Sequence, residues 1–143
     1  MSYIGFIRSR CIGVALTLII VTVASGCGGQ KLYPVEGRVI FPDGTPLAGG
    51  LVVFEPIEST TNVSARGQIQ ADGTFRLGTF RDDDGAIAGR HRALVAPPLP
   101  ARLDERNPAP PPIHARFRNF TTSGLEFLVT TSTNKFIITV EKP

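Results

Sequence analysis

Along most of the chain, hydrophobic and polar residues alternate with a period of two, the pattern of β-strands that are buried on one face. In the first such segment, residues 35–41, Val39 lies on one face and Glu36 and Arg38 lie on the other. Residues 51–55 are apolar on both faces, which predicts a central strand. The other predicted strands are residues 65–70, 75–79, 89–96, 125–129 and 136–140.

Turn-forming residues separate these segments. Pro42–Pro46 combines prolines that fix φ with a glycine that tolerates positive φ. Asp72 and Gly73, between two alternating segments, predict a tight hairpin. No convincing helical period follows Pro34, so the chain beyond this point is predicted to be all-β, an antiparallel sandwich or barrel of about seven strands.

The first 26 residues have a different composition, which is typical of an export signal. Arg8 and Arg10 form a short basic region, and the segment from Cys11 to Ser25 is almost entirely apolar or small. An apolar segment of about 15 residues fits the hydrophobic part of a signal peptide better than a membrane span, which needs about 20. Residues 1–26 are therefore predicted to be a signal-peptide helix that precedes the folded domain.

The apolar segment ends in Ala24-Ser25-Gly26-Cys27, which resembles the lipobox of bacterial lipoproteins. The resemblance implies cleavage before Cys27 and attachment of a diacylglycerol to its thiol. Residues 27–33 would then form a lipid-anchored tether, and residues 34–143 the folded domain.

Two features near this cysteine bear on the lipoprotein interpretation. Ala24 departs from the family pattern, in which leucine is commonest at this place. Gly28 stands where an aspartate would oppose export to the outer membrane, so the resemblance implies sorting to the outer membrane of the cell envelope. The alternative is a retained N-terminal helix anchor, because residues 11–30 carry no charge.

The net charge changes once the signal peptide is set aside. The whole chain carries +3, but removal of Arg8 and Arg10 leaves +1, so the basic character is no indication of nucleic-acid binding. The two cysteines, Cys11 and Cys27, both fall in the N-terminal segment. The mature domain is therefore predicted to contain no disulfide and no free thiol, and the sequence indicates no metal site and no cofactor.

Short motifs follow one another in a fixed order after Pro34. They are Val35-Glu36-Gly37-Arg38-Val39, Asp43-Gly44-Thr45-Pro46-Leu47-Ala48-Gly49, Val52-Val53-Phe54, Asp72-Gly73-Thr74-Phe75, Asp84-Gly85 with Gly89, and Ala93-Leu94-Val95. This order resembles that of the carboxypeptidase regulatory-like family, whose fold is transthyretin-like (prealbumin-type), and is similar to small bacterial lipoproteins with one such domain. The resemblance covers most of residues 34–141. It implies a seven-stranded antiparallel β-sandwich and an accessory or adhesive module.

Four arginines are the candidate binding residues. Arg90 and Arg92 lie two residues apart in one predicted strand, and Arg116 and Arg118 lie two residues apart in a later short segment. Alternation allows each pair to share one face, and neighbouring segments would bring the four together as a patch for phosphate or carboxylate groups of a cell-surface polysaccharide. The alternative is that these charges protect a sheet edge from aggregation.

The remaining polar candidates favour structural roles. His91 has no nucleophile or orienting carboxylate at signature spacing, and His114 has no metal-ligating partner at suitable spacing. Asp82–Asp84 could hold Ca²⁺, but adjacent aspartates are more typical of a solvated turn. Pro97–Pro112, with seven prolines, is predicted to be an extended surface segment, either a spacer or a binding loop.

Together these observations favour a lipoprotein of the bacterial cell envelope whose non-catalytic sandwich binds or spaces other envelope components. The predicted partners are the membrane, through Cys27, and an envelope protein or polysaccharide. One alternative is a glycan-binding module, although the chain has no Trp and only Tyr33 among tyrosines of the mature domain. The other is a small hydrolase of transthyretin-like fold, although the chain ends Val140-Glu141-Lys142-Pro143 and not in the Tyr-Arg-Gly-Ser tail of the 5-hydroxyisourate hydrolases.

Overall fold

The regular structure of the protein consists of β-strands and one turn of 3-10 helix. The computed structural model describes residues 29–60, 63–98 and 112–143, so the predicted signal peptide, Cys27 and most of the Pro-rich segment lie outside the described residues. In these three ranges, no helix is long and apolar enough to span a membrane. The elements are β1 (Leu32–Tyr33), β2 (Val35–Ile40), β3 (Leu51–Pro56), β4 (Ala65–Gln68), β5 (Thr74–Arg76), β6 (Ala86–Ile87), β7 (Gly89–Ala96), η1 (Ala115–Arg118), β8 (Leu125–Val129) and β9 (Asn134–Thr139).

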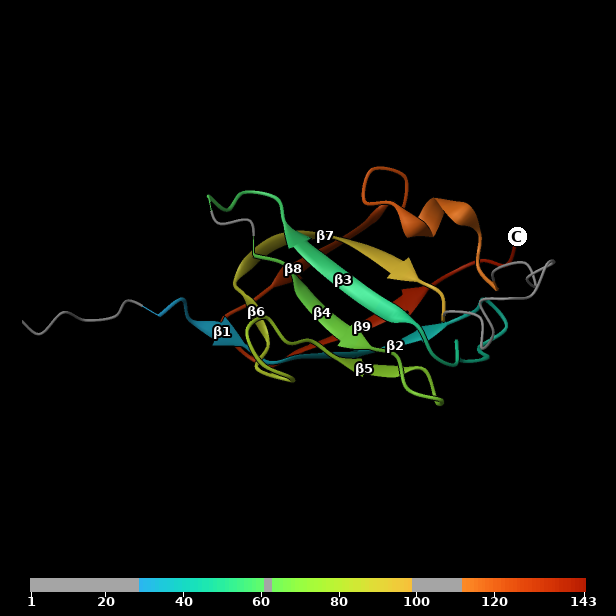
Figure 1. The fold of residues 1–143 in the computed structure, drawn as a ribbon, viewed down its shortest axis with the longest axis horizontal. Coiled ribbons are helices and arrows are strands. Elements are labelled where there is room, and N and C mark those ends of the chain that lie inside the picture. Colours follow the sequence, from blue (N-terminus) through green and yellow to red (C-terminus); the bar gives the residue numbers. More distant parts are fainter. Residues whose placement is uncertain (1–28, 61–62, 99–111) are drawn as a thin grey trace, which may run out of the picture.

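The strands form two main sheets and one short pair (Figure 1). One sheet has the order β5-β2-β9, the other has the order β4-β3-β7-β8, and β1 pairs with β6. Neighbouring strands are antiparallel except β2 and β9, which run parallel, so the prediction of a wholly antiparallel sandwich is wrong for this pair. Alternation shows which face of a strand is buried, but it does not show the direction of the strand beside it. The β4–β5 hairpin connects the two sheets, because Arg66 and Gly78 exchange two backbone hydrogen bonds of 2.9 Å. The outer surface therefore continues from β9 through β2 and β5 to β4.

Each segment that the alternation predicted as a strand contains one, and the all-β prediction is confirmed. The two additional strands, β1 and β6, have two residues each, which is too short for an alternation to be recognised. They pair through Leu32 with Ile87 and Tyr33 with Ala86, and so attach the start of the folded chain to the loop before β7.

The inner faces of the two main sheets pack on one hydrophobic core, as in a β-sandwich. Val39 of β2 and Val95 of β7 are fully buried in it, as the alternation predicts. Phe54 of β3 stacks on Phe127 of β8 with ring centroids 5.0 Å apart. The Phe127 centroid lies 4.9 Å from that of Phe136 of β9, so the aromatic rings link one sheet to the other.

Two turns with the sequence Asp-Gly-Thr have the same local structure. Gly44 and Gly73 have φ of 84° and 82°, the left-handed region that favours glycine. In the second turn, the Asp72 carboxylate accepts hydrogen bonds from the backbone N–H of Thr74 at 3.0 Å and from its hydroxyl at 2.6 Å. Asp43 accepts the same two bonds from Thr45. These bonds hold the pKa of both carboxyl groups below 3.8, the side-chain bond being the larger cause.

Candidate functional site

A polar groove of about 770 Å³ lies on the continuous outer surface formed by β9, β2, β5 and β4. Strand alternation directs the charged residues of these strands outward into it, because their neighbours in sequence point into the core. Asp82 and Asp83, in the loop after β5, also line it. The strand residues with charged or amide side chains in the groove are Glu36, Arg38, Arg66, Gln68, Arg76 and Lys135.

A row of three charges crosses the groove. Glu36 of β2 pairs in register with Arg76 of β5 on one side and with Lys135 of β9 on the other. The Lys135 ammonium lies 3.0 Å from the Glu36 carboxylate, and the Arg76 Nε lies 3.8 Å from it. The hydrogen bond and the charge of Lys135 hold the pKa of the Glu36 carboxyl below 4.5. The anion is thus shared between two cations and stays ionised near neutral pH.

Glycines form the floor of the groove where strands approach closely. A Cβ at Gly67 would lie 2.3 Å from the backbone oxygen of Arg76, and a Cβ at Gly37 would lie 2.4 Å from that of Phe136. Real Cβ atoms do not approach so closely, so only glycine permits this packing of neighbouring strands.

Two further arginines keep donors available in the groove. The Arg38 Nε donates to the backbone oxygen of Asp72 at 2.9 Å, and its charge helps to lower the pKa of the Asp72 carboxyl, but its terminal nitrogens form no ion pair in the described chain. The Arg66 guanidinium has no hydrogen-bond or ion-pair partner among the described residues. An arginine fork matches the geometry of a carboxylate or phosphate, so this part of the groove is suited to an anionic group.

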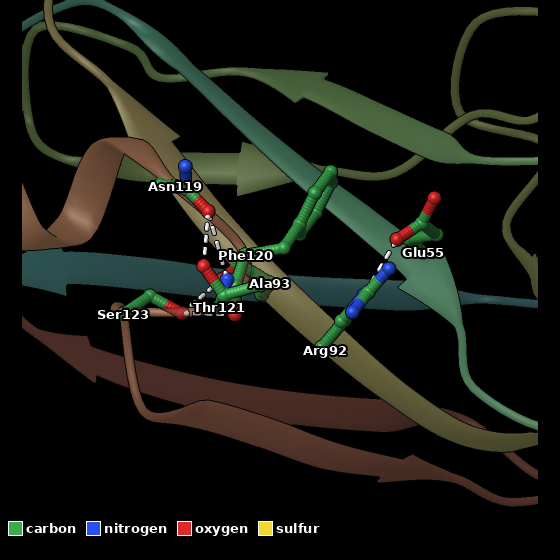
Figure 2. A network of polar contacts seen from close by, with 7 residues as sticks. All are labelled: Glu55, Arg92, Ala93, Asn119, Phe120, Thr121 and Ser123. Carbon is green, nitrogen blue, oxygen red and sulfur yellow. Dashed lines mark hydrogen bonds and ion pairs between the residues drawn. The ribbon is translucent and has the colours of Figure 1, made fainter.

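The predicted arginine patch has a different arrangement. Arg90 lies 2.9 Å from the Glu126 carboxylate and 3.7 Å from that of Glu58. Arg92 points toward Glu55 in Figure 2. Its Nε lies 2.6 Å from the Glu55 carboxylate, and its guanidinium lies 5.4 Å from the centroid of the Phe120 ring. Both arginines of β7 are therefore engaged by carboxylates of the fold.

The prediction that Arg116 and Arg118 share one face by strand alternation is wrong. Residues 115–118 form the 3-10 helix η1, in which three residues complete a turn, so positions two apart point in different directions. Arg116 pairs with Glu141 at 3.1 Å and lies over the Phe117 ring. The Arg118 side chain has no partner among the residues that the structure describes.

Polar contacts after η1 hold this segment against β7 (Figure 2). The Ser123 hydroxyl donates to the backbone oxygen of Ala93 in β7 at 2.6 Å. The Asn119 side-chain oxygen accepts hydrogen bonds from the Thr121 N–H at 2.9 Å and hydroxyl at 2.8 Å. These bonds stabilise a turn, so the network is structural.

The contacts of His91, His114 and the Asp82–Asp84 loop support the fold. His91 is fully buried, its Nδ1 lies 3.0 Å from the Gly89 oxygen, and its Nε2 has no partner in the described chain. Burial lowers its pKa below 6.5. The His114 Nδ1 accepts the Arg116 N–H at 3.2 Å. Asp84 accepts three backbone N–H bonds within its own loop, and no group of three metal-ligating side chains occurs within the described ranges.

The groove was not predicted from the sequence. Alternation placed Arg38 on the outer face of its strand, and the same period of two in β4 and β5 is the signal that could have placed Arg66 and Arg76 there. It could not show that β2 lies between β5 and β9, because strand order depends on the tertiary fold.

No family model, curated protein or solved structure matches this chain.

Proposed function

We propose that this chain is a lipoprotein of the bacterial cell envelope, anchored through Cys27, and that its non-catalytic β-sandwich binds another envelope component through the groove. The observation that carries this proposal is the groove itself. Its volume of about 770 Å³ falls within the usual range for ligand sites, about 300–1,000 Å³. The lipobox resemblance supports an outer-membrane location, with two or more acyl chains giving stable anchoring.

We also propose that the domain is a seven-stranded, transthyretin-like sandwich of the carboxypeptidase regulatory-like type, with its seven strands in the two main sheets. Its support is that the motif glycines Gly44, Gly73 and Gly85 all have positive φ, between 82° and 96°. The motifs therefore mark turns that require glycine, which is the role that the resemblance implies for them.

The non-catalytic role is supported by the positions of the histidines. A general base must lie within hydrogen-bonding distance of the proton that it removes. His91 is fully buried in the core, and His114 is engaged by the backbone of η1. Neither residue lines the groove.

An acidic glycan is the ligand that the groove favours. Arg38 and Arg66 offer guanidinium donors for carboxylates, and Gln68, Gln70 and Thr74 offer hydrogen bonds for hydroxyl groups. The aromatic stacking platforms common in sugar-binding sites are few here, since the lining aromatics are Phe75, which is buried, and Phe136, which is half-buried. Recognition would therefore depend on charge and hydrogen bonds, and should weaken at high salt.

The binding experiment compares two arginines that lack partners in the described chain, one inside the groove and one outside it. Full-length protein carrying Arg66→Glu or Arg118→Glu is cross-linked in its native membrane, and the bound components are identified by mass spectrometry. Purified acidic envelope polysaccharide is tested in parallel for retention. We expect Arg66→Glu to lose at least about tenfold in binding, because the free donor is replaced by a like charge, and Arg118→Glu to bind as the wild type does.

Two outcomes would contradict this proposal. Loss of binding in Arg118→Glu with retention in Arg66→Glu would move the site to the segment around η1. Equal binding by both variants would remove the groove as the site. The mass of the N-terminal peptide tests the anchor separately, since an unmodified chain that begins at Met1 would contradict lipidation of Cys27.

A further inference from the structure

A large apolar side chain is exposed at the end of the sandwich where the chain enters its first strand. Phe80, in the loop between β5 and β6, is 63% exposed. Figure 1 shows this loop beside β1, at the end of the sandwich opposite to the Asp43-Gly44 turn. Ile57, which follows β3 at the same end, is 41% exposed.

The loop that presents Phe80 is held in one shape by its own hydrogen bonds. The Asp84 carboxylate accepts the backbone N–H groups of Thr79 at 2.6 Å, Phe80 at 3.1 Å and Arg81 at 2.9 Å. The Thr79 hydroxyl donates to the Gly85 oxygen at 2.7 Å. The exposed ring therefore stands on a fixed support, and it is not the tip of a loosely held loop.

The same loop packs directly on β1. A Cβ at Gly85 would lie 2.1 Å from the backbone oxygen of Tyr33, so the two backbones are in close contact. Cys27 precedes Leu32 by five residues, which span at most about 17 Å when fully extended. A lipid on Cys27 would therefore hold this end of the sandwich close to the bilayer surface.

The loop separates its apolar and acidic parts. Asp82 and Asp83 line the groove, whereas Phe80 and Arg81 do not. A phenylalanine next to an arginine suits the membrane interface, where the ring enters the acyl boundary and the guanidinium stays among the headgroups.

We infer that Phe80 contacts the lipid surface and fixes the orientation of the sandwich on the membrane. This inference rests on the proposed lipidation of Cys27. The β1 and β6 end then faces the bilayer, and the opposite end, with the Asp43-Gly44 turn, faces away from it. The groove, on the side of the sandwich, stays accessible to a second envelope component.

The absence of tryptophan from the chain allows a direct test with single-tryptophan variants. Phe80→Trp places the probe at the proposed contact, and Ile137→Trp is the matched control, because Ile137 is 69% exposed on the outer face of β9. Each lipidated variant is reconstituted into phosphatidylethanolamine–phosphatidylglycerol vesicles that contain lipids brominated on the acyl chains. Bromine quenches only an indole that reaches the acyl region.

We expect Phe80→Trp to lose about half of its emission in brominated vesicles, because interfacial side chains reach about 5–10 Å into the boundary, whereas Ile137→Trp keeps its emission. Equal quenching of the two variants, or none in Phe80→Trp, would overturn the inference while leaving the lipid anchor intact. Mass spectra without lipid on Cys27, together with failure to float with vesicles, would instead overturn the proposed anchor and the inference with it.

Discussion

The outer faces of the two main sheets carry charge rows of opposite pattern. On the sheet β5-β2-β9, the central strand contributes the anion Glu36, with the cations Arg76 and Lys135 directly opposite it on the flanking strands. This row has two cations for one anion and lies in the groove. Its side chains are well exposed, 66% for Arg76 and 76% for Lys135, so the cations remain accessible to a ligand.

On the other sheet the central strand contributes the cation. Arg92 of β7 is in register with Glu55 of β3 and with Glu126 of β8. Arg92 forms an ion pair with Glu55. Glu126 of β8 forms its ion pair with Arg90, the other arginine of β7. On this sheet each of the two arginines of β7 has a carboxylate partner, so both guanidinium charges are already neutralised.

The difference shows that the number of arginines in a segment does not indicate an anion site. Arg90 and Arg92 are close in sequence, but the strands on either side of β7 supply carboxylates to them. The sequence around Arg66 did not suggest a binding role. In the structure, however, its side chain faces the groove and has no partner in the described chain. What decides availability is which residues the neighbouring strands place opposite, because a paired guanidinium has already satisfied part of its hydrogen-bonding capacity.

The largest loss of stability should come from a side chain added where two strands meet at the floor of the groove. We expect Gly67→Ala to lower the free energy of unfolding by about 3 kcal/mol, because its Cβ would lie 2.3 Å from the Arg76 backbone oxygen and β4 would have to move away from β5. Gly124→Ala is the control, since Gly124 has a φ of 66° but open space around its Cβ, and it should cost about 1 kcal/mol. Urea unfolding measures both, and equal losses would show that the close approach of β4 and β5 is not required.

The inner side of β7 provides a second test, since His91 lies between the outward-facing Arg90 and Arg92. Burial lowers the pKa of His91 in the folded state below the 6.5 of the unfolded chain, so the unfolded state binds more protons as the pH falls. Stability should be greatest above pH 6.5 and should decrease below it, by at most about 1.4 kcal/mol per pH unit for one proton. The pKa of Glu36 lies below 4.5, so its effect falls at lower pH.

Chemical denaturation between pH 7.5 and about pH 5 measures this dependence on His91. His91→Phe should remove it, because a neutral ring of similar size would occupy the site beside Phe54. His114→Phe is the control, because it changes the other described histidine and keeps His91 in the core. A slope that persists in His91→Phe would show that another group is responsible.

The features that the sequence predicted well are local ones. Alternation correctly placed Val39 in the core and Glu36 and Arg38 outside it, because each choice depends only on the period of two. Gly44 and Gly73 were correctly placed in turns, since positive φ restricts the residue type strongly.

The features that the sequence could not predict depend on strand order and on short irregular segments. The parallel pairing of β2 with β9 joins Glu36 to Lys135, almost a hundred residues later in the chain, and nothing in either strand specifies the other as its neighbour. The groove consists of side chains brought together in this way. The 3-10 conformation of η1 was also unpredictable, because four residues are too few to show a helical period.

The smallest expected effect is also the most direct test of the comparison between the two faces. Arg92→Ala removes the 2.6 Å pair with Glu55 and the contact with Phe120, and should lower stability by about 0.5–1 kcal/mol, the upper part of the range for surface ion pairs. Arg66→Ala should change stability by less than about 0.5 kcal/mol, because its guanidinium has no partner in the described chain.

A double-mutant cycle assigns the Arg92 effect to its pair. If the ion pair is responsible, Glu55→Ala combined with Arg92→Ala should cost less than the sum of the single variants, by about 0.5 kcal/mol. Thermal and urea unfolding at two salt concentrations give the stabilities, and the coupling should decrease at high salt. A larger loss for Arg66→Ala than for Arg92→Ala would contradict this prediction, because it would show that the groove arginine serves the fold.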